Sequence, residues 1–350
     1  MSENGERLMR RAVELSRQGF PAPNPHVGCV FAVGGEVVGE GFHDHAGGPH
    51  AEVLALRSAG RRAQGADLYC TLEPCDHHGR TPPCSHAIVE AGVRRAFVAV
   101  EDPNAEAAGG LKTLREAGVE CRVGLLAEEA EDANLTFLTA MRRGRPFVVA
   151  KAAVTADGFI AREDGESKWI TGEPAREAGR LLRAEMGCVL VGRKTAETDD
   201  PQLTVRVPGI VNQPLRVVLD PSAALPDGLK MFVDGGETVR IVQKGAAQRS
   251  GDLAVACGDD GLDLGAALQA LFERGVVGVL VEGGGETIAS FLRRGLVDRI
   301  ELFRSKVNFK SGRFWLGENP PEHELEQTAQ ETVGEDVRTT YRVLSPVSGT

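Results

Sequence analysis

The chain has 350 residues, 42% hydrophobic and 26% charged, a length that corresponds to about two globular domains. Its 40 lysines and arginines against 50 aspartates and glutamates give a net charge of −10, with the acid excess in both halves, which argues against nucleic-acid binding. Aromatic residues, at 5%, are too few to suggest a surface that stacks unpaired bases.

The N-terminal sequence lacks a signal-peptide pattern, and no apolar run approaches the roughly 18 residues of a membrane span. We therefore expect a cytoplasmic protein without membrane partners. Seven cysteines in such a chain favour a metal or catalytic role over a disulfide framework.

In the first half, predicted strands alternate with helices, a pattern that indicates an α/β layer with some parallel strands. The glycine pair at 34–35 predicts a hairpin turn. In chain order we expect helix 6–18, strands 27–33 and 36–42, helix 49–59, strand 67–72, helix 83–91, strand 95–101, helix 110–117, strand 119–123 and helix 127–141.

A short basic segment with glycine and proline, 142–146, separates the halves, and we expect domains over 1–144 and 145–350. The second half also predicts an α/β domain, but the pattern does not organise residues 305–336. The expected elements are strand 147–154, helix 173–185, strands 188–191, 215–219 and 239–242, helix 265–274, strand 276–281, helix 286–294, strand 299–303 and a last edge strand 338–344.

Three residues of the first half form a candidate zinc site. His50, Cys75 and Cys84 offer one nitrogen and two thiolates, which leaves the fourth position of Zn²⁺ open for water, as in catalytic sites. Bound zinc lowers the pKa of that water to about 7. Glu52, two residues after His50, is the candidate that moves protons between the water and a leaving amine.

The spacing matches the H-x-E…P-C-x-x-C signature of zinc deaminases, with the cysteine pair widened by the insert 76–83. The alternative, ordinary buried cysteines and a histidine at a helix start, needs this joint match to be a coincidence. We accept that alternative for the other cysteines, which are Cys29, Cys70, Cys121, Cys188 and Cys257.

Two further polar residues are candidates for binding a pyrimidine. Asn24 can present both a donor and an acceptor to a base edge, and is equally well explained as a turn residue between prolines. His43 follows the hairpin and is a second candidate for the same pocket, although a solvated loop histidine is the more frequent case.

Together these residues resemble the deaminase half of the bifunctional riboflavin-biosynthesis deaminase/reductase family. The resemblance rests on segments 23–28, 41–43, 46–52 and 71–84. It implies a cytidine-deaminase-like α/β/α domain with zinc at His50, Cys75 and Cys84 and with Glu52 as the proton shuttle. It implies substrate contacts from Asn24, His43, His77, Arg80, Asp102 and Asn104.

This half departs from the family pattern at two positions. Asp76 stands where the family usually has serine, and Ala105 where it usually has proline. Both departures concern loops and not the metal ligands.

The second half resembles the reductase half of the same family, whose fold is similar to dihydrofolate reductase. The resemblance rests on segments 151–158, 165–171, 192–195, 199–206 and 279–287. Glycines 283–285, between a strand and a helix, can hold a diphosphate with backbone N–H groups and can equally form a close-packed turn. They do not form G-x-G-x-x-G, so we predict no Rossmann domain.

The resemblance also implies roles for single residues of this half. Lys151 lies near the reacting sugar, and Lys151 and Glu282 are candidates for assisting ring opening. The implied substrate contacts are Ser167, Arg183, Leu203, Arg206 and Glu282. The implied NADPH contacts are Ala153, Trp169, Thr195, Asp199, Ser222, Gly284, Gly285, Glu286, Thr287, Ile288, Ala289 and Ser290. In 304–320 the chain departs from the family, which usually has an Ala-Pro-Lys-like turn there.

The hypothesis is therefore a bifunctional enzyme of riboflavin biosynthesis. It would deaminate 2,5-diamino-6-(5-phosphoribosylamino)pyrimidin-4(3H)-one with zinc, and then reduce the ribosyl chain to ribityl with NADPH. The alternatives are a deaminase with a structural second domain and a zinc-stabilised nucleotide-binding module without turnover. The sequence leaves open NADPH against NADH, direct passage of the intermediate between sites, and the oligomeric state, a homo-oligomer included.

Overall fold

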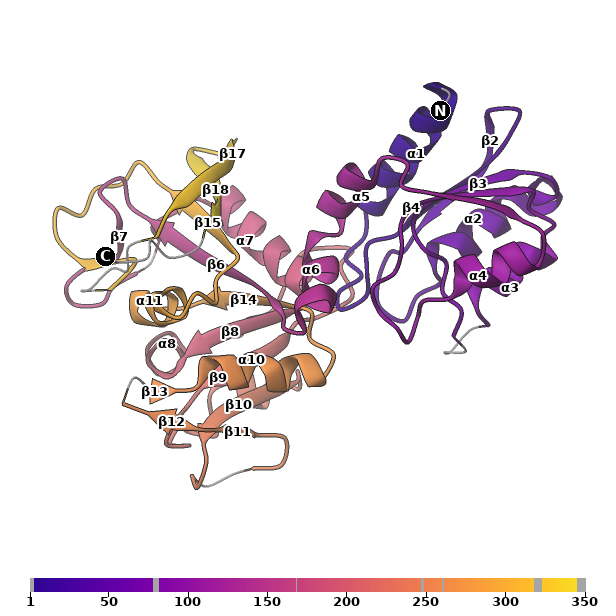
Figure 1. The fold of residues 1–350 in the computed structure, drawn as a ribbon. Helices are drawn as coiled ribbons and strands as arrows, with labels where there is room; N and C mark the ends of the chain where they lie inside the picture. Colours follow the sequence, from indigo (N-terminus) through magenta and orange to yellow (C-terminus); the bar gives the residue numbers. More distant parts are fainter. Residues whose placement is uncertain are drawn as a thin grey trace. The chain divides into compact units, whose positions relative to one another are not determined.

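The computed structural model describes residues 3–77, 82–167, 169–246, 249–259, 261–317 and 323–344. The chain divides into two compact units, Met1–Arg143 and Gly144–Thr350, and each combines helices with one large sheet (Figure 1). Within the described ranges, no helix has the length and apolar character needed to cross a membrane.

The first unit is built on a five-stranded mixed sheet in the order β2-β1-β3-β4-β5. Strands β2 and β3 run antiparallel to β1, whereas β3, β4 and β5 run parallel. The strands are β1 Gly28–Val33, β2 Glu36–Phe42, β3 Asp67–Leu72, β4 Arg95–Val100 and β5 Glu120–Val123. The helices are α1 Glu3–Ser16, α2 Ala51–Ala59, the 3-10 helix η1 Gly60–Ala63, α3 Cys84–Glu90, α4 Gly110–Glu116, α5 Ala127–Ala133 and α6 Leu135–Arg143.

Helices cover both faces of this sheet. A side chain at Gly28 would collide with the Ala12 carbonyl oxygen of α1, and a Cβ at Gly41 would lie 2.7 Å from the Ala51 oxygen of α2. Gly41 pairs with Cys29 across β1 and β2, so these two residues point to one face and Gly28 points to the other. The helices α1 and α2 therefore pack on opposite faces, which gives an α/β/α sandwich.

The second unit is built on a nine-stranded sheet in the order β11-β10-β9-β8-β14-β6-β15-β18-β17. Neighbouring strands are parallel except at β15–β18 and β18–β17. The strands of this sheet are β6 Phe147–Val154, β8 Cys188–Gly192, β9 Leu215–Leu219, β10 Thr238–Gln243, β11 Leu253–Val255, β14 Gly278–Glu282, β15 Arg299–Arg304, β17 Leu325–Val333 and β18 Asp336–Val343.

Two small ribbons and five helices complete the described part of this unit. The ribbons pair β7 Phe159–Ala161 with β16 Arg313–Phe314, and β12 Cys257–Gly258 with β13 Gly261–Leu262. The helices are α7 Glu173–Met186, α8 Arg193–Asp199, α9 Lys230–Val233, α10 Leu264–Glu273 and α11 Gly285–Arg293.

The central strands bury side chains on both faces of this sheet. Val148 and Ala150 of β6 pack in one core with α10 and α11, whereas Phe147 and Val149 pack with α7 in another. Because successive residues of a strand point to opposite faces, α7 lies on the other side of the sheet from α10 and α11 (Figure 1). Burial on both faces explains why these strands are nearly continuous apolar runs.

The structure corrects two predictions about these elements. The helix predicted over 127–141 is two helices, α5 and α6, because buried Asn134 leaves the helical conformation and accepts a hydrogen bond from the His26 N–H. The strand predicted at the edge, β18, is covered by β17, which forms in the stretch that the pattern did not organise. Nearly every residue of β17 is exposed, so it has no apolar alternation for a pattern to detect.

Candidate active sites

In the first unit, three metal-ligating side chains converge on one point. His50 is the residue before α2, Cys75 follows β3 and Cys84 begins α3. The His50 Nδ1 atom lies 3.5 Å from the Cys75 Sγ and 3.3 Å from the Cys84 Sγ, and all three ligand atoms lie within 4.8 Å of one another. A tetrahedral zinc with one nitrogen and two sulfur ligands requires N···S separations of about 3.6 Å. The donor set and its spacing therefore fit zinc.

The environment favours a thiolate at this point. Hydrogen bonding from the Cys84 thiol, and then from His50, lowers the pKa of Cys75 well below that of a free thiol, although burial opposes this. The Cys84 backbone N–H also donates to the Cys75 sulfur, at 3.5 Å. Since thiolates are the form of cysteine that binds metals, the site is prepared to accept a cation.

Glu52 lies in the first turn of α2 and is only 4% exposed. Burial raises the pKa of its carboxyl group, while the neighbouring His50 imidazole opposes the shift. A carboxyl group with a raised pKa beside a metal site is suited to accept and return a proton near neutral pH.

His43 lies beside the ligand His50, and Asn24 contacts His43. The Pro49 carbonyl oxygen lies 3.0 Å from the His43 Nδ1, so this nitrogen carries the proton and donates it there. The opposite nitrogen, Nε2, then accepts a hydrogen bond of 3.0 Å from the Asn24 amide. Burial lowers the pKa of His43, which keeps the ring neutral, and its centroid lies 5.4 Å from that of His50.

The remaining predicted substrate contacts of this unit belong to the loops around Cys75. Half-buried Asp102 follows β4, and its Oδ1 accepts a hydrogen bond of 2.8 Å from the Asn104 N–H. Burial, together with the nearby Glu73 carboxylate, raises the pKa of Asp102 to about 6. His77 is exposed, and Arg80 lies outside the described residues.

Sequence reasoning missed the organising role of Glu73. This buried carboxylate accepts hydrogen bonds from the N–H groups of Asp102, Gly109 and Leu111, at 2.9 to 3.2 Å. It thereby fixes the loop that carries Asp102 against the loop that carries Cys75. The position of Glu73 directly before Pro74-Cys75 was the only signal that pointed to it.

Asp76, one of the two departures from the family pattern, has a structural explanation. Its carboxylate accepts hydrogen bonds from the Ser85 hydroxyl of α3 and, at 3.0 Å, from the Thr113 hydroxyl of α4. The aspartate therefore ties together the two helices that flank the zinc ligands.

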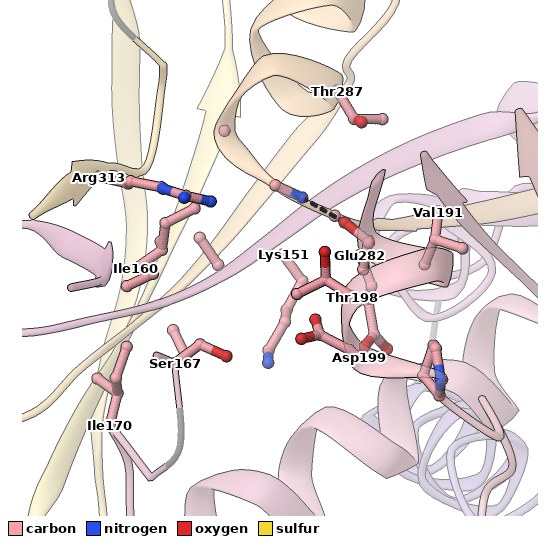
Figure 2. A pocket seen from close by; sticks show the side chains of 18 of the residues that line it. Lys151, Ile160, Ser167, Ile170, Val191, Thr198, Asp199, Glu282, Thr287 and Arg313 are labelled. Atoms are coloured by element: carbon pink, nitrogen blue, oxygen red, sulfur yellow. Dashed lines mark hydrogen bonds between the residues drawn. The ribbon is translucent and has the colours of Figure 1, made fainter. Parts of the chain in front are cut away.

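In the second unit, a cavity of about 1140 Å³ opens where the parallel strands β6 and β14 end. This is the usual place for a ligand in an open α/β sheet. Among the labelled side chains, Lys151, Ser167 and Asp199 point into the same space (Figure 2). The predicted contacts that line the cavity are Lys151, Ala153, Ser167, Trp169, Arg183, Thr195, Asp199, Leu203, Glu282, Gly284, Gly285, Glu286 and Thr287.

A charged triad forms the floor of this cavity. Arg183 of α7 donates two hydrogen bonds to the Glu282 carboxylate, at 2.7 and 2.8 Å, and a third to the Thr204 carbonyl oxygen. Lys151 stands directly beside Glu282 in the register of β6 and β14. Burial lowers the pKa of Lys151, whereas burial alone would raise that of Glu282 and the charges of Arg183 and Lys151 lower it overall. Three N–H groups of Arg183 are thus committed within the protein.

Five predicted contacts of this unit do not line the cavity. Ile288 and Ala289 are fully buried in α11, and the Ser290 hydroxyl accepts a hydrogen bond from Arg294. The Ser222 hydroxyl accepts one from Arg193, and Arg206 donates to Gln202.

Other residues line the cavity that the sequence did not indicate. One of them is Arg176, which stacks its guanidinium 4.3 Å from the ring centroid of exposed Trp169. Lys194 and Arg313 also line the cavity. Only their spatial position reveals Arg176, Lys194 and Arg313, because single basic residues form no sequence pattern.

The chain therefore has the features of a two-domain metalloenzyme. One domain is an α/β/α sandwich with an open N/S₂ candidate metal site, and the other is an α/β domain with a polar cavity at its strand ends. Residues 2–100 match the cytidine and deoxycytidylate deaminase zinc-binding region, and residues 146–337 match the RibD C-terminal domain.

The riboflavin biosynthesis protein RibD of Bacillus amyloliquefaciens is 42% identical over 313 residues, covering 86% of this chain and 84% of that protein. That of Aquifex aeolicus is 42% identical over 308 residues, covering 86% of each. The solved structure of Acinetobacter baumannii RibD superposes with a TM-score of 0.88 at 36% identity, covering 98% of this chain and 99% of that one. A deaminase/reductase from Thermotoga maritima gives 0.83 at 34% identity, covering 97% and 99%.

The chain belongs to the RibD family of bifunctional riboflavin biosynthesis enzymes, with a deaminase domain and a reductase domain. The resemblance noted in the sequence and the predicted fold class are thereby confirmed. Because the similarity extends over both halves, a deaminase with a merely structural second domain is not favoured.

Proposed function

We propose that the chain catalyses two successive steps on one phosphorylated pyrimidine. The first removes an amino group from 2,5-diamino-6-(5-phosphoribosylamino)pyrimidin-4(3H)-one, and the second reduces the ribosyl chain of the product to ribityl. The observation that carries this proposal is the convergence of His50, Cys75 and Cys84 beside buried Glu52, in one chain with a cavity floored by Lys151 and Glu282.

In the deaminase site, His50, Cys75 and Cys84 would hold zinc, which when bound activates water for attack on the amine-bearing ring carbon. Glu52 takes a proton from the attacking water and delivers it to the departing ammonia. Its burial supports this role, because a raised pKa allows the carboxyl group to be both charged, ready to accept a proton, and protonated, ready to return it.

Polar groups around the metal would orient the ring of the substrate. The Asn24 amide offers a donor and an acceptor, and the Asp102 carboxylate can accept hydrogen bonds from exocyclic amines. His77, Arg80 and Asn104 complete the proposed set, with Arg80 suited to the ribose phosphate.

In the reductase site, NADPH would supply a hydride to C1′ of the opened ribosylamine. We assign its binding to the side of the cavity that begins at Thr195, Asp199 and the first turn of α11. Lys151 has a lowered pKa and can exchange a proton during ring opening, while Arg183 holds the Glu282 carboxylate in its charged form.

The decisive experiment follows ammonia release and then loss of NADPH absorbance with the full chain and the phosphorylated diaminopyrimidinone. Both signals are expected in sequence. Removal of zinc by a chelator should abolish ammonia release, whereas NADPH consumption should persist when the deaminated pyrimidine is supplied directly. Ammonia release without any NADPH consumption would contradict the second half of the proposal.

The Glu52→Gln variant tests the assigned proton shuttle. We expect ammonia release to fall by about 10²–10⁴-fold while the zinc content stays at the wild-type level. Glu14→Gln, on the exposed side of α1, removes the same charge far from the ligands and should match the wild type. Loss of zinc from Glu52→Gln would show that Glu52 holds the metal and not the proton.

A further inference from the structure

Among the described residues, five side chains on the cavity wall carry positive charge: Lys151, Arg176, Arg183, Lys194 and Arg313. Two of them are neutralised by carboxylates, Arg183 by Glu282 and Arg176 by Glu173. Lys151 stands beside Glu282 in the sheet. Since the chain as a whole is acidic, an anionic ligand must be held by the cations that remain.

Arg313 is one of these remaining cations. No hydrogen bond or ion pair joins its guanidinium to any other residue in the described part of the chain, and the side chain extends from β16 into the cavity (Figure 2). Its Nη2 passes close over Gly165, where a Cβ would lie 3.3 Å away. The guanidinium therefore lies along the wall with its donors available to a ligand.

Close backbone packing fixes the segment that carries Arg313. A Cβ at Gly285, the first residue of α11, would lie 2.6 Å from both the Phe314 carbonyl oxygen and the Gly317 nitrogen. On the other side, a side chain at Gly312 would collide with the Ala161 carbonyl oxygen of β7. The segment packs between β7 and the start of α11, and this packing fixes the position of Arg313 relative to that helix.

The first turn of α11 complements the arginine. Its backbone N–H groups form the positive end of the helix dipole, although those of Thr287 and Ile288 already donate to the Gly284 carbonyl oxygen. The Glu286 carboxylate in this turn also lines the cavity, but it lies 3.6 Å from the Arg293 guanidinium, which offsets part of its charge. An anion placed between Arg313 and this turn would meet cationic and backbone donors from two sides.

We propose that Arg313 binds the diphosphate of the nicotinamide dinucleotide from the side opposite the first turn of α11. This inference rests on the proposed function, since it takes the dinucleotide as the occupant of that end of the cavity. The substrate also carries a phosphate. The dinucleotide is favoured because the segment that carries Arg313 packs directly against Gly285, the first residue of α11.

The test measures dissociation constants by calorimetry for NADPH, NADH and ribose 5-phosphate with the full-length protein. For Arg313→Gln we expect about a tenfold weaker affinity for NADPH and the same factor for NADH, because both share the diphosphate. Arg313→Lys keeps the charge without the planar fork and should lose about threefold. Ribose 5-phosphate should bind all forms alike.

Arg342→Gln provides the matched control, because this exposed arginine pairs with Glu326 between β17 and β18 and does not line the cavity. It should bind both dinucleotides like the wild type. At saturating NADPH, Arg313→Gln should keep its kcat within about twofold and raise only KM, as expected when ground state and transition state lose binding equally. A retained kcat at saturating NADPH, and wild-type unfolding transitions in the emission of Trp169 and Trp315, confirm that the second unit of the variant is folded.

Three outcomes would overturn the inference. The first is an affinity of Arg313→Gln for NADPH equal to that of the wild type. The second is a loss of affinity for NADPH without a loss for NADH, which would assign Arg313 to the 2′-phosphate. The third is a loss of affinity for ribose 5-phosphate. If the wild type binds neither dinucleotide, the cofactor assignment of the proposed function fails and the inference fails with it. A wild type that binds NADPH and an Arg313→Gln that binds it equally well overturns the inference alone.

Discussion

The charged triad on the cavity floor makes an asymmetric prediction about stability. Glu282 is shared by two cations, Arg183 through two short hydrogen bonds and Lys151 as its neighbour in the sheet. Replacing Glu282 by glutamine leaves Arg183 and Lys151 facing each other without a counter-charge. Replacing Arg183 by glutamine leaves Glu282 still opposed by Lys151. Glu282→Gln should therefore destabilise the second unit more than Arg183→Gln does.

The magnitude follows from burial. The side chains of Arg183 and Glu282 are only 14% and 15% exposed, and removing one partner of a buried ion pair costs about 3–5 kcal/mol. We expect Glu282→Gln to lose that amount, roughly 6–20 °C in Tm for a unit of this size. Arg183→Gln should lose less, about 1–2 kcal/mol.

The pH dependence has a definite sign. Burial lowers the pKa of Lys151, Glu282 opposes the shift and Arg183 adds to it, so Glu282→Gln should lower that pKa further. Between this folded-state pKa and the unfolded value of 10.5, the unfolded chain binds more protons and stability rises with pH. The deficit of Glu282→Gln should therefore shrink as the pH rises through the lowered folded-state pKa of Lys151 in the variant.

Tryptophan fluorescence measures the stability of the second unit without a contribution from the first. Both tryptophans of the chain, Trp169 and Trp315, belong to the second unit, so urea or thermal transitions followed by their emission report on that unit alone. Equal losses in the two variants, or a deficit in Glu282→Gln that stays constant with pH, would show that Lys151 does not share the charge of Glu282.

Two further predictions concern the first unit. Gly110→Ala would press a methyl group into the Pro74 carbonyl oxygen and displace the loop before Cys75, so zinc content and ammonia release should fall together. Gly228→Ala, a control in the second unit whose methyl group meets open space, should change neither. Wild-type zinc content in Gly110→Ala would refute this reasoning. Burial alone would raise the pKa of Asp67, but its two arginine partners lower it below 3.8 overall, so its stabilisation is present above about pH 4 and is lost as pH falls through the folded-state pKa. Asp67→Asn should cost about 1–2 kcal/mol at neutral pH and flatten the acid limb of the unfolding curve, while exposed Asp132→Asn should do neither.

The sequence by itself predicted the class of fold and the metal ligands. The central strands are apolar runs between turn residues, a signal that does not depend on distant contacts, and β3 and β6 begin and end where the pattern placed them. The candidate ligands His50, Cys75 and Cys84 were visible because zinc sites require particular residue types at restricted spacings.

Local exceptions to these patterns came only from tertiary contacts. The break at Asn134 depends on a hydrogen bond to His26, more than a hundred positions earlier in the chain, and β17 forms only because β18 offers it an edge. No window of neighbouring residues contains either partner, so no periodicity can anticipate them.

Charge pairing was decided in the same way. Glu73 accepts hydrogen bonds from N–H groups of a loop about thirty positions away, and Arg183 pairs with Glu282 across 99 positions. Backbone contacts at Gly285 and Gly312 bring Arg313 close to the start of α11. Residue type states what a side chain can bind. Only the folded chain determines which partner lies within reach, because ion pairs and hydrogen bonds depend on separations of a few ångströms that sequence distance does not encode.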